Sequence, residues 1–470
     1  MEIHMHVAQA VQVLNHDSLS CNRVAANQWL VQFQHSDAAW DVATNILTSE
    51  PPHHLYGYEL HLFAAQVLKR KIQSEGVTLQ AEFRSALQAA LLVSAKRYST
   101  GPPQLLTQIC LALSALVLRA VELKKPVEKL FASLSEIQGH GVGSHAILEL
   151  LTVLPEEVIE ENVVNATVNS ERRWHFTQEL LSHTGIVLEF LLKETKDDTI
   201  SKSEVQEKHK KVLRSLLSWV RVGCFLEIPQ SNVASHPLLG FVFDSLQAPA
   251  LFDLAVEVIV ELVSRHEALP QALVLRMQWF KDALLLPAIN NKNDRAISGL
   301  ACLLSEVGQA APMLITVGSH EAFILTDALL RCVAYPDHDW EIADSTLSFW
   351  CAIVEFILAL SSEVEKKNAL ASFTPVYTVL LDALFLRAKV SDDNAKELDD
   401  TGSLPDGLIR FRRNLEELLT DICYLLGPTN FLAKVLNGSW TTSESEIYWE
   451  IVEVRLFALN TMNCGGTMGK

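Results

Sequence analysis

Apolar residues recur at spacings of three and four along most of this chain, which places their side chains on one face of a helix. The stretch from Leu105 to Val117 shows this spacing clearly, and the stretch from Leu251 to Leu262 shows it again. Strand-like alternation is nearly absent, and no Asn-Gly or Asp-Gly hairpin separates two β-branched runs. The pattern predicts an all-α protein.

Short breaks rich in Pro, Gly and Asn-Asp pairs interrupt the helical pattern at frequent intervals. The predicted helices have about 12–20 residues, so two helices with their turns occupy about 35–45 residues, the period of HEAT and armadillo arrays. Each helix pair in such an array buries its apolar face on its neighbours. We therefore predict a helical-repeat superhelix, or α-solenoid, of about ten helix pairs with a concave protein-binding wall. Two segments, at residues 193–211 and 388–406, are expected to be polar inserts, either loops or frayed helix ends.

The composition indicates a folded chain with an acidic surface. Of the 470 residues, 49% are hydrophobic, which excludes disorder as a description of the whole chain. The net charge of −18 argues against direct binding of nucleic acid, because phosphate contacts need a concentrated excess of Lys and Arg. Residues 1–235 hold 21 Lys+Arg and 25 Asp+Glu, whereas residues 236–470 hold 17 and 31. A basic partner is therefore expected to be steered towards the C-terminal half.

Cysteine spacing and apolar runs bear on the cellular compartment. The eight cysteines include no CxxC pair and no short spacing to a histidine cluster, so they predict no structural zinc site. The first residues have neither the basic nor the apolar region of a signal peptide. The longest apolar stretch, Leu105–Leu118, is shorter than a membrane span. We expect a reduced, intracellular, soluble chain with no membrane insertion.

Sequence motifs for catalysis are missing. The chain has no phosphate loop, GxSxG elbow, HExxH pair or kinase motif set. Gly139–Ser144 is rich in glycine but follows a predicted helix rather than a strand, so we interpret it as an inter-helix loop. The pairs His4/His6 and His53/His54 are interpreted as exposed terminal and loop residues. The sequence predicts no catalytic site, no bound metal and no cofactor.

Several segments that follow one another in a fixed order carry more specific information. They are Arg23–Phe33, Ala38–Ala43, Leu62–Ile72, Leu106–Leu116, Leu148–Val158 (with Leu-Thr-Val-Leu-Pro-Glu-Glu), Leu216–Gly223, Tyr335–Asp337 with Phe349–Trp350, and Phe411–Arg413 with Asp421–Gly427. The first three resemble the N-terminal domain that opens importin-β proteins. From the ordered set over residues 5–460, the chain is identified as a member of the importin-β (karyopherin) family of nuclear transport receptors, in the transportin-3/importin-13 branch.

Most residues in these segments are expected to pack between helices rather than to bind ligands. The aromatic residues interpreted in this way are Trp29, Phe33, Trp40, Phe63, Trp219, Phe349 and Trp350. Pro155 is expected at the first position of a helix, with Glu156 and Glu157 in the first turn, where negative charge suits the helix dipole. These motifs indicate the fold without forming a site.

The resemblance implies that the first repeats bind the GTP form of the small GTPase Ran on their inner helices. It also implies that Ran and protein cargo compete for the concave wall, that nucleoporin FG repeats bind the outer surface, and that the receptor shuttles between cytoplasm and nucleus. Arg-Ser-rich splicing factors are the cargo class associated with transportin-3. By position, the inner helices are expected near residues 17–34, 54–73 and 102–121. The polar residues on the last two are the candidate Ran contacts: Glu59, Gln66, Lys69, Arg70, Gln73, Gln104, Thr107 and Gln108.

The resemblance also implies a division of the chain. Residues 1–100 are expected to form the importin-β N-terminal-like domain, residues 101–460 the continuing HEAT array, and residues 461–470 a divergent Gly-rich tail. Members of the family are longer, so we interpret the chain as a C-terminally truncated form. The alternative is a general HEAT-type scaffold without Ran binding. An all-α enzyme is disfavoured because the chain shows no convergent set of acid, base and nucleophile.

Overall fold

A computed structural model of the chain describes residues 2–49, 58–120, 125–138, 144–159, 168–196, 202–338, 340–390, 404–436 and 449–465. These residues fold almost entirely into helices, and no strand occurs among them. The chain divides into two compact units, Met1–Pro229 and Gln230–Lys470. The prediction of an all-α fold is confirmed.

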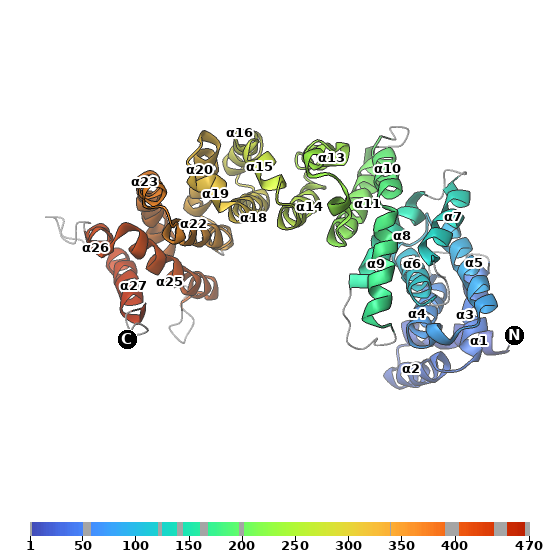
Figure 1. The fold of residues 1–470 in the computed structure, drawn as a ribbon. Helices are drawn as coiled ribbons and strands as arrows, with labels where there is room; N and C mark the ends of the chain where they lie inside the picture. The colour runs from blue at the N-terminus through green and yellow to red at the C-terminus, as the bar shows by residue number, and fades with distance from the viewer. Residues whose placement is uncertain are drawn as a thin grey trace. The chain divides into compact units, whose positions relative to one another are not determined.

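The first unit is a stack of helices in two layers. Helices α4, α6, α8 and α11 contact one another in succession as one layer, and α3 and α5 pack against it (Figure 1). The inner helices expected from the sequence correspond to α2, α4 and α6. The helices of this unit are α1 (Glu2–His16), α2 (Ser20–Gln34), α3 (Ala38–Thr48), α4 (Tyr58–Glu75), η2 (Gly76–Thr78), α5 (Ala81–Arg97), α6 (Pro103–Leu118), α7 (Pro126–Gln138), α8 (Ser144–Ile159), α9 (Ser170–Ser182), α10 (Thr184–Glu194), α11 (Lys202–Arg221) and η4 (Cys224–Glu227).

The second unit repeats this construction. Helices α14, α18, α22 and α25 contact one another in succession, while α20 contacts α23. A π-helical segment, η5, interrupts the regular pattern. The helices of this unit are α12 (Gln230–Val233), α13 (Pro237–Ser245), α14 (Phe252–Arg265), α15 (Leu269–Val274), α16 (Met277–Trp279), η5 (Phe280–Leu285), α17 (Leu286–Asn290), α18 (Asp294–Ala310), α19 (Pro312–Thr316), α20 (His320–Ala334), α21 (Glu341–Asp344), α22 (Leu347–Ala359), α23 (Glu363–Ala388), α25 (Asp406–Leu426), α26 (Pro428–Leu436) and α27 (Trp449–Gly465).

The aromatic residues singled out in the sequence lie mainly in the core. The buried ones are Phe33, Trp40, Trp219, Phe349 and Trp350. Trp29 and Phe63 are half-buried instead. They flank Phe33 in a stack, with ring centroids 5.7 Å apart for Trp29 and Phe33 and 6.5 Å apart for Phe33 and Phe63. The aromatic rings therefore join helices α2 and α4, as the packing interpretation requires.

Pro155 lies inside α8, so the expectation that it starts a helix was wrong. A proline has no N–H group and leaves the carbonyl four residues earlier without its helical donor. In α8 that carbonyl belongs to Leu151, and the indole Nε1–H of Trp219 on α11 donates a hydrogen bond to it over 2.9 Å. Pro155 is tolerated because a neighbouring helix supplies the hydrogen bond that the proline removes.

Glu156 and Glu157 consequently lie near the C-terminal end of α8, where the helix dipole disfavours negative charge. Specific partners offset this cost. Glu157 pairs with Arg119 over 3.1 Å, and both side chains are buried. Glu156 accepts a hydrogen bond from the Ser218 hydroxyl over 2.9 Å. The motif that includes Pro155 is therefore a junction between α8, α11 and the end of α6.

The segment at residues 193–211, expected to be a polar insert, is largely helical. Helix α10 continues to Glu194 and α11 begins at Lys202. The Lys208 Nζ lies 2.8 Å from the Glu194 carboxylate, and both side chains are less than a tenth exposed. The polar composition of the segment did not show that Glu194 on α10 and Lys208 on α11 pair across the interface of these helices.

Four other segments discussed in the sequence analysis lie wholly or partly outside the described residues. At the expected insert 388–406, α23 ends at Ala388 and α25 begins at Asp406, while residues 391–403 lie outside the description. Most of the glycine-rich loop at 139–144 and the pair His53/His54 also lie outside it. Helix α27 continues through Gly465, beyond the position where the sequence predicted a tail, and residues 466–470 are not described.

Two stretches of the described chain, Glu341–Ala359 and Glu363–Ala388, are long and apolar enough to cross a membrane by length and composition alone. The sequence analysis singled out only the shorter stretch at Leu105–Leu118. Within the second unit, the Tyr377 hydroxyl donates a hydrogen bond to the Trp350 carbonyl over 2.7 Å, and both side chains are fully buried. The fold buries 50% of the apolar window in the first stretch and 33% of that in the second, and one or two such helices are weak evidence for a membrane span.

Candidate functional site

Glu59, the first of the predicted contact residues on α4, joins this helix to α1. Its Oε2 atom accepts a hydrogen bond from Asn15 Nδ2 over 3.0 Å and lies 3.0 Å from His16 Nε2. The side chain is 37% exposed. Glu59 therefore links α1 to α4 as well as facing solvent, and a charge reversal there would also break this contact between the two helices.

The other predicted residues at the C-terminal end of α4 differ in their surroundings. Arg70 is exposed, and its Nη1 donates a hydrogen bond to Gln34 Oε1 on α2 over 2.9 Å. Lys69 and Gln73 are half-buried. The main-chain carbonyl of Gln73 accepts a hydrogen bond from Arg119 Nε over 3.2 Å. Arg70 is thus the most accessible charged group of this set.

The structure brings four of the predicted residues together in one hollow between α4 and α6. Gln66 comes from α4, and Gln104, Thr107 and Gln108 come from the first turns of α6. Leu62 and Pro103 complete the lining of a space of about 310 Å³. The amide and hydroxyl groups of these side chains can both donate and accept hydrogen bonds. We call this group the amide hollow.

The polar surface continues onto residues that the sequence analysis missed. Thr107 donates a short hydrogen bond to Glu149 on α8. Lys211 on α11 lies near the same carboxylate, and burial lowers the pKa of Lys211 while Glu149 opposes that shift. Glu149 stands in a helix interpreted only as packing, and Lys211 in a segment interpreted as an insert. Only the stacking of α6, α8 and α11 places these residues beside the amide hollow.

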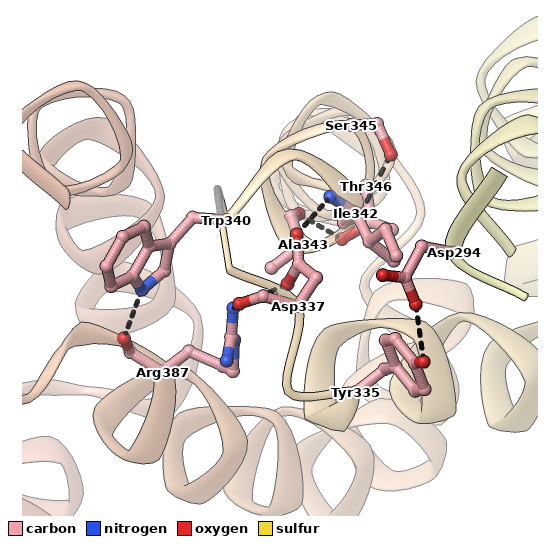
Figure 2. Close-up of polar contacts among 9 residues, drawn as sticks. All are labelled: Asp294, Tyr335, Asp337, Trp340, Ile342, Ala343, Ser345, Thr346 and Arg387. Atoms are coloured by element: carbon pink, nitrogen blue, oxygen red, sulfur yellow. Dashed lines mark hydrogen bonds and ion pairs between the residues drawn. The ribbon is translucent and has the colours of Figure 1, made fainter. Parts of the chain in front are cut away.

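A second set of polar contacts fixes the loop between α20 and α21 in the second unit. Figure 2 shows Arg387 reaching Asp337: its Nη2 lies 2.5 Å from Asp337 Oδ1 and 2.8 Å from the Asp337 carbonyl. The Trp340 indole donates to the Arg387 carbonyl over 2.8 Å, and Tyr335 donates to Asp294 over 2.6 Å. Trp340 has a φ of 58°, a strained value for a bulky residue that these contacts hold in place. This loop is a structural junction between α18, α20 and α23.

The hydrogen bond and nearby charges at Tyr335 agree with this role. The hydrogen bond to Asp294, followed by burial and the Asp294 and Asp337 charges, raises the pKa of Tyr335 to about 12. The hydroxyl therefore stays protonated and keeps donating throughout the physiological range. Burial lowers the pKa of Arg387, and the Asp337 carboxylate opposes that shift.

Three carboxylates gather where α22 meets α25. Burial, followed by the charges of Glu417 and Glu355, raises the pKa of Asp421 to about 6. The Cys351 thiol is within hydrogen-bonding reach of Asp421, and burial followed by these carboxylates raises its pKa to about 12. Cys351 therefore stays a neutral thiol, and Asp421 changes its charge close to neutral pH.

Asp421→Asn is expected to stabilise the second unit at about pH 7.5 by about 1 kcal/mol, allowing for its partial exposure. A carboxyl whose pKa is higher in the folded state stabilises that state below its unfolded pKa of 3.8, and this contribution is lost as pH rises through about 6. The melting temperature followed by circular dichroism should therefore rise in the variant at about pH 7.5 and change little at about pH 3, below the unfolded pKa. Glu416→Gln, on the exposed side of α25, is the control. An unchanged or lower melting temperature at the higher pH would contradict the prediction.

Comparison with known proteins shows which family has this helical architecture. A family model described as "Exportin 1-like protein" matches residues 102–259, and one described as "Transportin-3/Importin-13 second TPR domain" matches residues 292–386. Transportin MOS14 of Arabidopsis thaliana is 27% identical over 98% of this chain, and human Importin-13 is 27% identical over 97%. The chain belongs to the importin-β family, in its transportin-3/importin-13 branch. The resemblance stated from the sequence is confirmed.

The importin-β assignment is supported by the fold as well. The solved structure titled "Importin13 cytosolic state" aligns with a TM-score of 0.61 and 16% identity, over 86% of this chain and 46% of that chain. The prediction of a HEAT-type solenoid is thereby confirmed. The chain spans about half the length of the curated relatives it matches, 48% of Transportin MOS14 and 47% of Importin-13. The matched relatives are named as importins and transportins, which are transport receptors rather than enzymes.

Proposed function

We propose that this importin-β family chain acts as a nuclear transport receptor that binds the GTP form of Ran on α2, α4 and α6 and carries protein cargo into the nucleus. It would work by exchange of binding partners rather than by catalysis. The supporting observation is the amide hollow in a chain of this family. Its polar side chains line a surface that the described helices of the first unit leave uncovered.

The chemistry of the amide hollow suits a protein partner. Gln66, Gln104, Thr107 and Gln108 supply hydrogen-bonding groups around an apolar floor that includes Leu62. Arg70 adds an exposed cation at the far end of α4. A polar protein surface with scattered carboxylates and main-chain groups would find donors and acceptors there. Ran contact at these residues is part of the proposal.

The remaining partners follow from the same family assignment. Residues 236–470 hold 31 Asp+Glu against 17 Lys+Arg, which favours a basic cargo, and Arg-Ser-rich splicing factors have that character. Nucleoporin FG repeats would bind the outer surface, and the receptor would shuttle between cytoplasm and nucleus. A domain boundary near residue 100 is part of the proposal, and the Exportin 1-like match begins at residue 102.

A pull-down of the purified chain with Ran tests the proposal. We expect retention of Ran loaded with GTP and at least about tenfold less retention of the GDP form, which corresponds to about 1.4 kcal/mol of preference. The double variant Arg70→Glu/Gln104→Glu should weaken binding by about tenfold or more, because it reverses the exposed charge of Arg70 on α4 and adds a negative charge at Gln104 in the amide hollow.

The double variant Gln88→Glu/Lys96→Glu is the matched control, since it makes the same change in net charge on α5. Circular dichroism should show that both variants keep the helical content of the parent chain. If a folded chain retains neither form of Ran, the receptor proposal fails and a HEAT-type scaffold is the better description. If the α5 variant is as weak as the α4/α6 variant, the amide hollow is not the Ran site.

A further inference from the structure

An apolar groove lies between α7, α8 and α10 in the first unit, and it shares no lining residue with the amide hollow. It has a volume of about 530 Å³, within the range of sites that bind ligands. Its apolar lining consists of Phe131, Leu134, Ile147, Leu151, Ile186, Val187, Phe190 and Leu192. The described helices therefore leave a hydrophobic surface open at this point.

The exposed apolar side chains on one face of α10 are the clearest sign that no described helix covers the groove. Ile186 is 63% exposed, whereas Val187, the next residue, is 2% exposed. Ile186, Phe190 and Lys193 follow one another at spacings of four and three, so they share one side of α10 over about two helical turns. An apolar stripe at this spacing is the kind of surface against which another helix packs.

Charge at one end of the groove indicates the chemistry of that helix. Lys193 and Lys196 both line the groove and are exposed. Within the described part of the chain neither forms an ion pair, whereas Lys125, Lys208 and Lys210 each do. Glu189 is the single acidic residue of the lining, so the groove is cationic at its rim although the whole chain carries a net charge of −18.

We propose that this groove binds an acidic amphipathic helix of a partner protein. Its apolar residues would pack against Ile186, Phe190 and Phe131, and its carboxylates would pair with Lys193 and Lys196. The lysines would then select the acidic helix over a basic one, because like charges brought together at a desolvated rim cost binding free energy. This surface is separate from the proposed Ran site, so its occupation does not depend on that function.

Fluorescence anisotropy with three labelled synthetic peptides tests the proposal on the full chain. The first, of about 14 residues, has leucines at positions i, i+3, i+4 and i+7 and glutamates on the flank. The second carries lysine in place of each glutamate, and the third is a neutral Phe-Gly repeat. We expect a Kd of about 10–100 µM for the acidic peptide, weakening with salt, and at least about tenfold weaker binding of the other two.

Two variants locate the binding on the groove. Lys193→Glu/Lys196→Glu should weaken the acidic peptide about tenfold and strengthen the lysine peptide, an exchange of preference that loss of folding would not produce. Ile186→Ser should weaken the acidic peptide several-fold, and folding should tolerate it because the side chain is exposed. The control Lys367→Glu/Lys389→Glu makes the same change in net charge in the second unit and should leave binding unchanged.

Several results would overturn the inference. They are no binding of the acidic peptide up to about 1 mM, equal binding of the acidic and lysine peptides, or no effect of Lys193→Glu/Lys196→Glu. Tighter binding of the neutral Phe-Gly peptide than of the acidic one, abolished by Ile186→Ser, would assign the groove to an uncharged ligand instead. Loss of Ran binding alone would leave this proposal standing, and loss of peptide binding alone would leave the Ran proposal standing.

Discussion

Glu157→Ala is expected to destabilise the first unit by about 3–5 kcal/mol, because it leaves the buried Arg119 guanidinium without its counter-charge. The Arg119 side chain is 2% exposed and the Glu157 side chain 7%, with 3.1 Å between their nitrogen and oxygen. Arg119 also donates to the carbonyls of Gln73 and Ala115, each over 3.2 Å, and these bonds cannot replace a carboxylate. Hydrogen exchange measured by mass spectrometry should show the loss of protection in α6 and α8.

The control for this prediction is Glu171→Ala on α9, where the side chain is exposed and the expected change is below about 0.5 kcal/mol. The double variant Arg119→Met/Glu157→Leu distinguishes the effect of the paired charges from the effect of the volume that the two side chains fill. Replacing both charges with apolar groups of similar size should restore most of the stability. If the double variant loses as much stability as Glu157→Ala, Arg119 is needed for its other contacts. The argument from an unpaired buried charge would then be wrong.

Trp219→Ala is expected to cost about 3–5 kcal/mol, from the cavity left by a fully buried indole and from the lost hydrogen bond to Leu151. Trp219→Phe keeps most of the packing and isolates the hydrogen bond. It should cost about 1–3 kcal/mol, since the Leu151 carbonyl then lacks both its helical donor, removed by Pro155, and its replacement. Urea denaturation followed by circular dichroism, together with hydrogen exchange of α8, measures both effects.

A second substitution tests whether Trp219 acts by compensating for Pro155. Pro155→Ala gives α8 back the N–H group that the Leu151 carbonyl needs. We therefore expect Pro155→Ala to stabilise the Trp219→Phe chain by about 1 kcal/mol or more beyond its effect in the parent chain. The compensation argument fails if the two substitutions are additive. The control Trp174→Phe changes an indole that is 59% exposed on α9 and should leave stability nearly unchanged.

Much of the candidate site could be predicted from the sequence. Gln66 was chosen by helical spacing, and Gln104, Thr107 and Gln108 as the polar positions of a helix that the family resemblance made an inner one. The structure places these four residues around one hollow. The same spacing could not show that Glu59 contacts Asn15 on α1, because the partner comes from another helix at a distance of 44 residues. For the same reason Glu149, which accepts from Thr107, was missed.

The error at Pro155 has a different cause. Proline at the first position of a helix is the common arrangement, and the two following glutamates favour it further. The exception in α8 depends on Trp219, which is 68 residues away from Leu151 in the chain. No residue near Pro155 in the sequence indicates that Trp219 supplies this hydrogen bond, although the segments Leu148–Val158 and Leu216–Gly223 were each recognised from the sequence.

By itself, the sequence determined the all-α class, the helical repeat, the family and most of the aromatic core, because each of these depends on local spacing or on an ordered set of local motifs. The tertiary structure alone decided which charges pair and which polar groups lie open. The Glu194–Lys208 pair and the uncovered Lys193 come from neighbouring positions of one sequence segment. They differ because partners from other helices reach one and not the other, and those partners are far away along the chain.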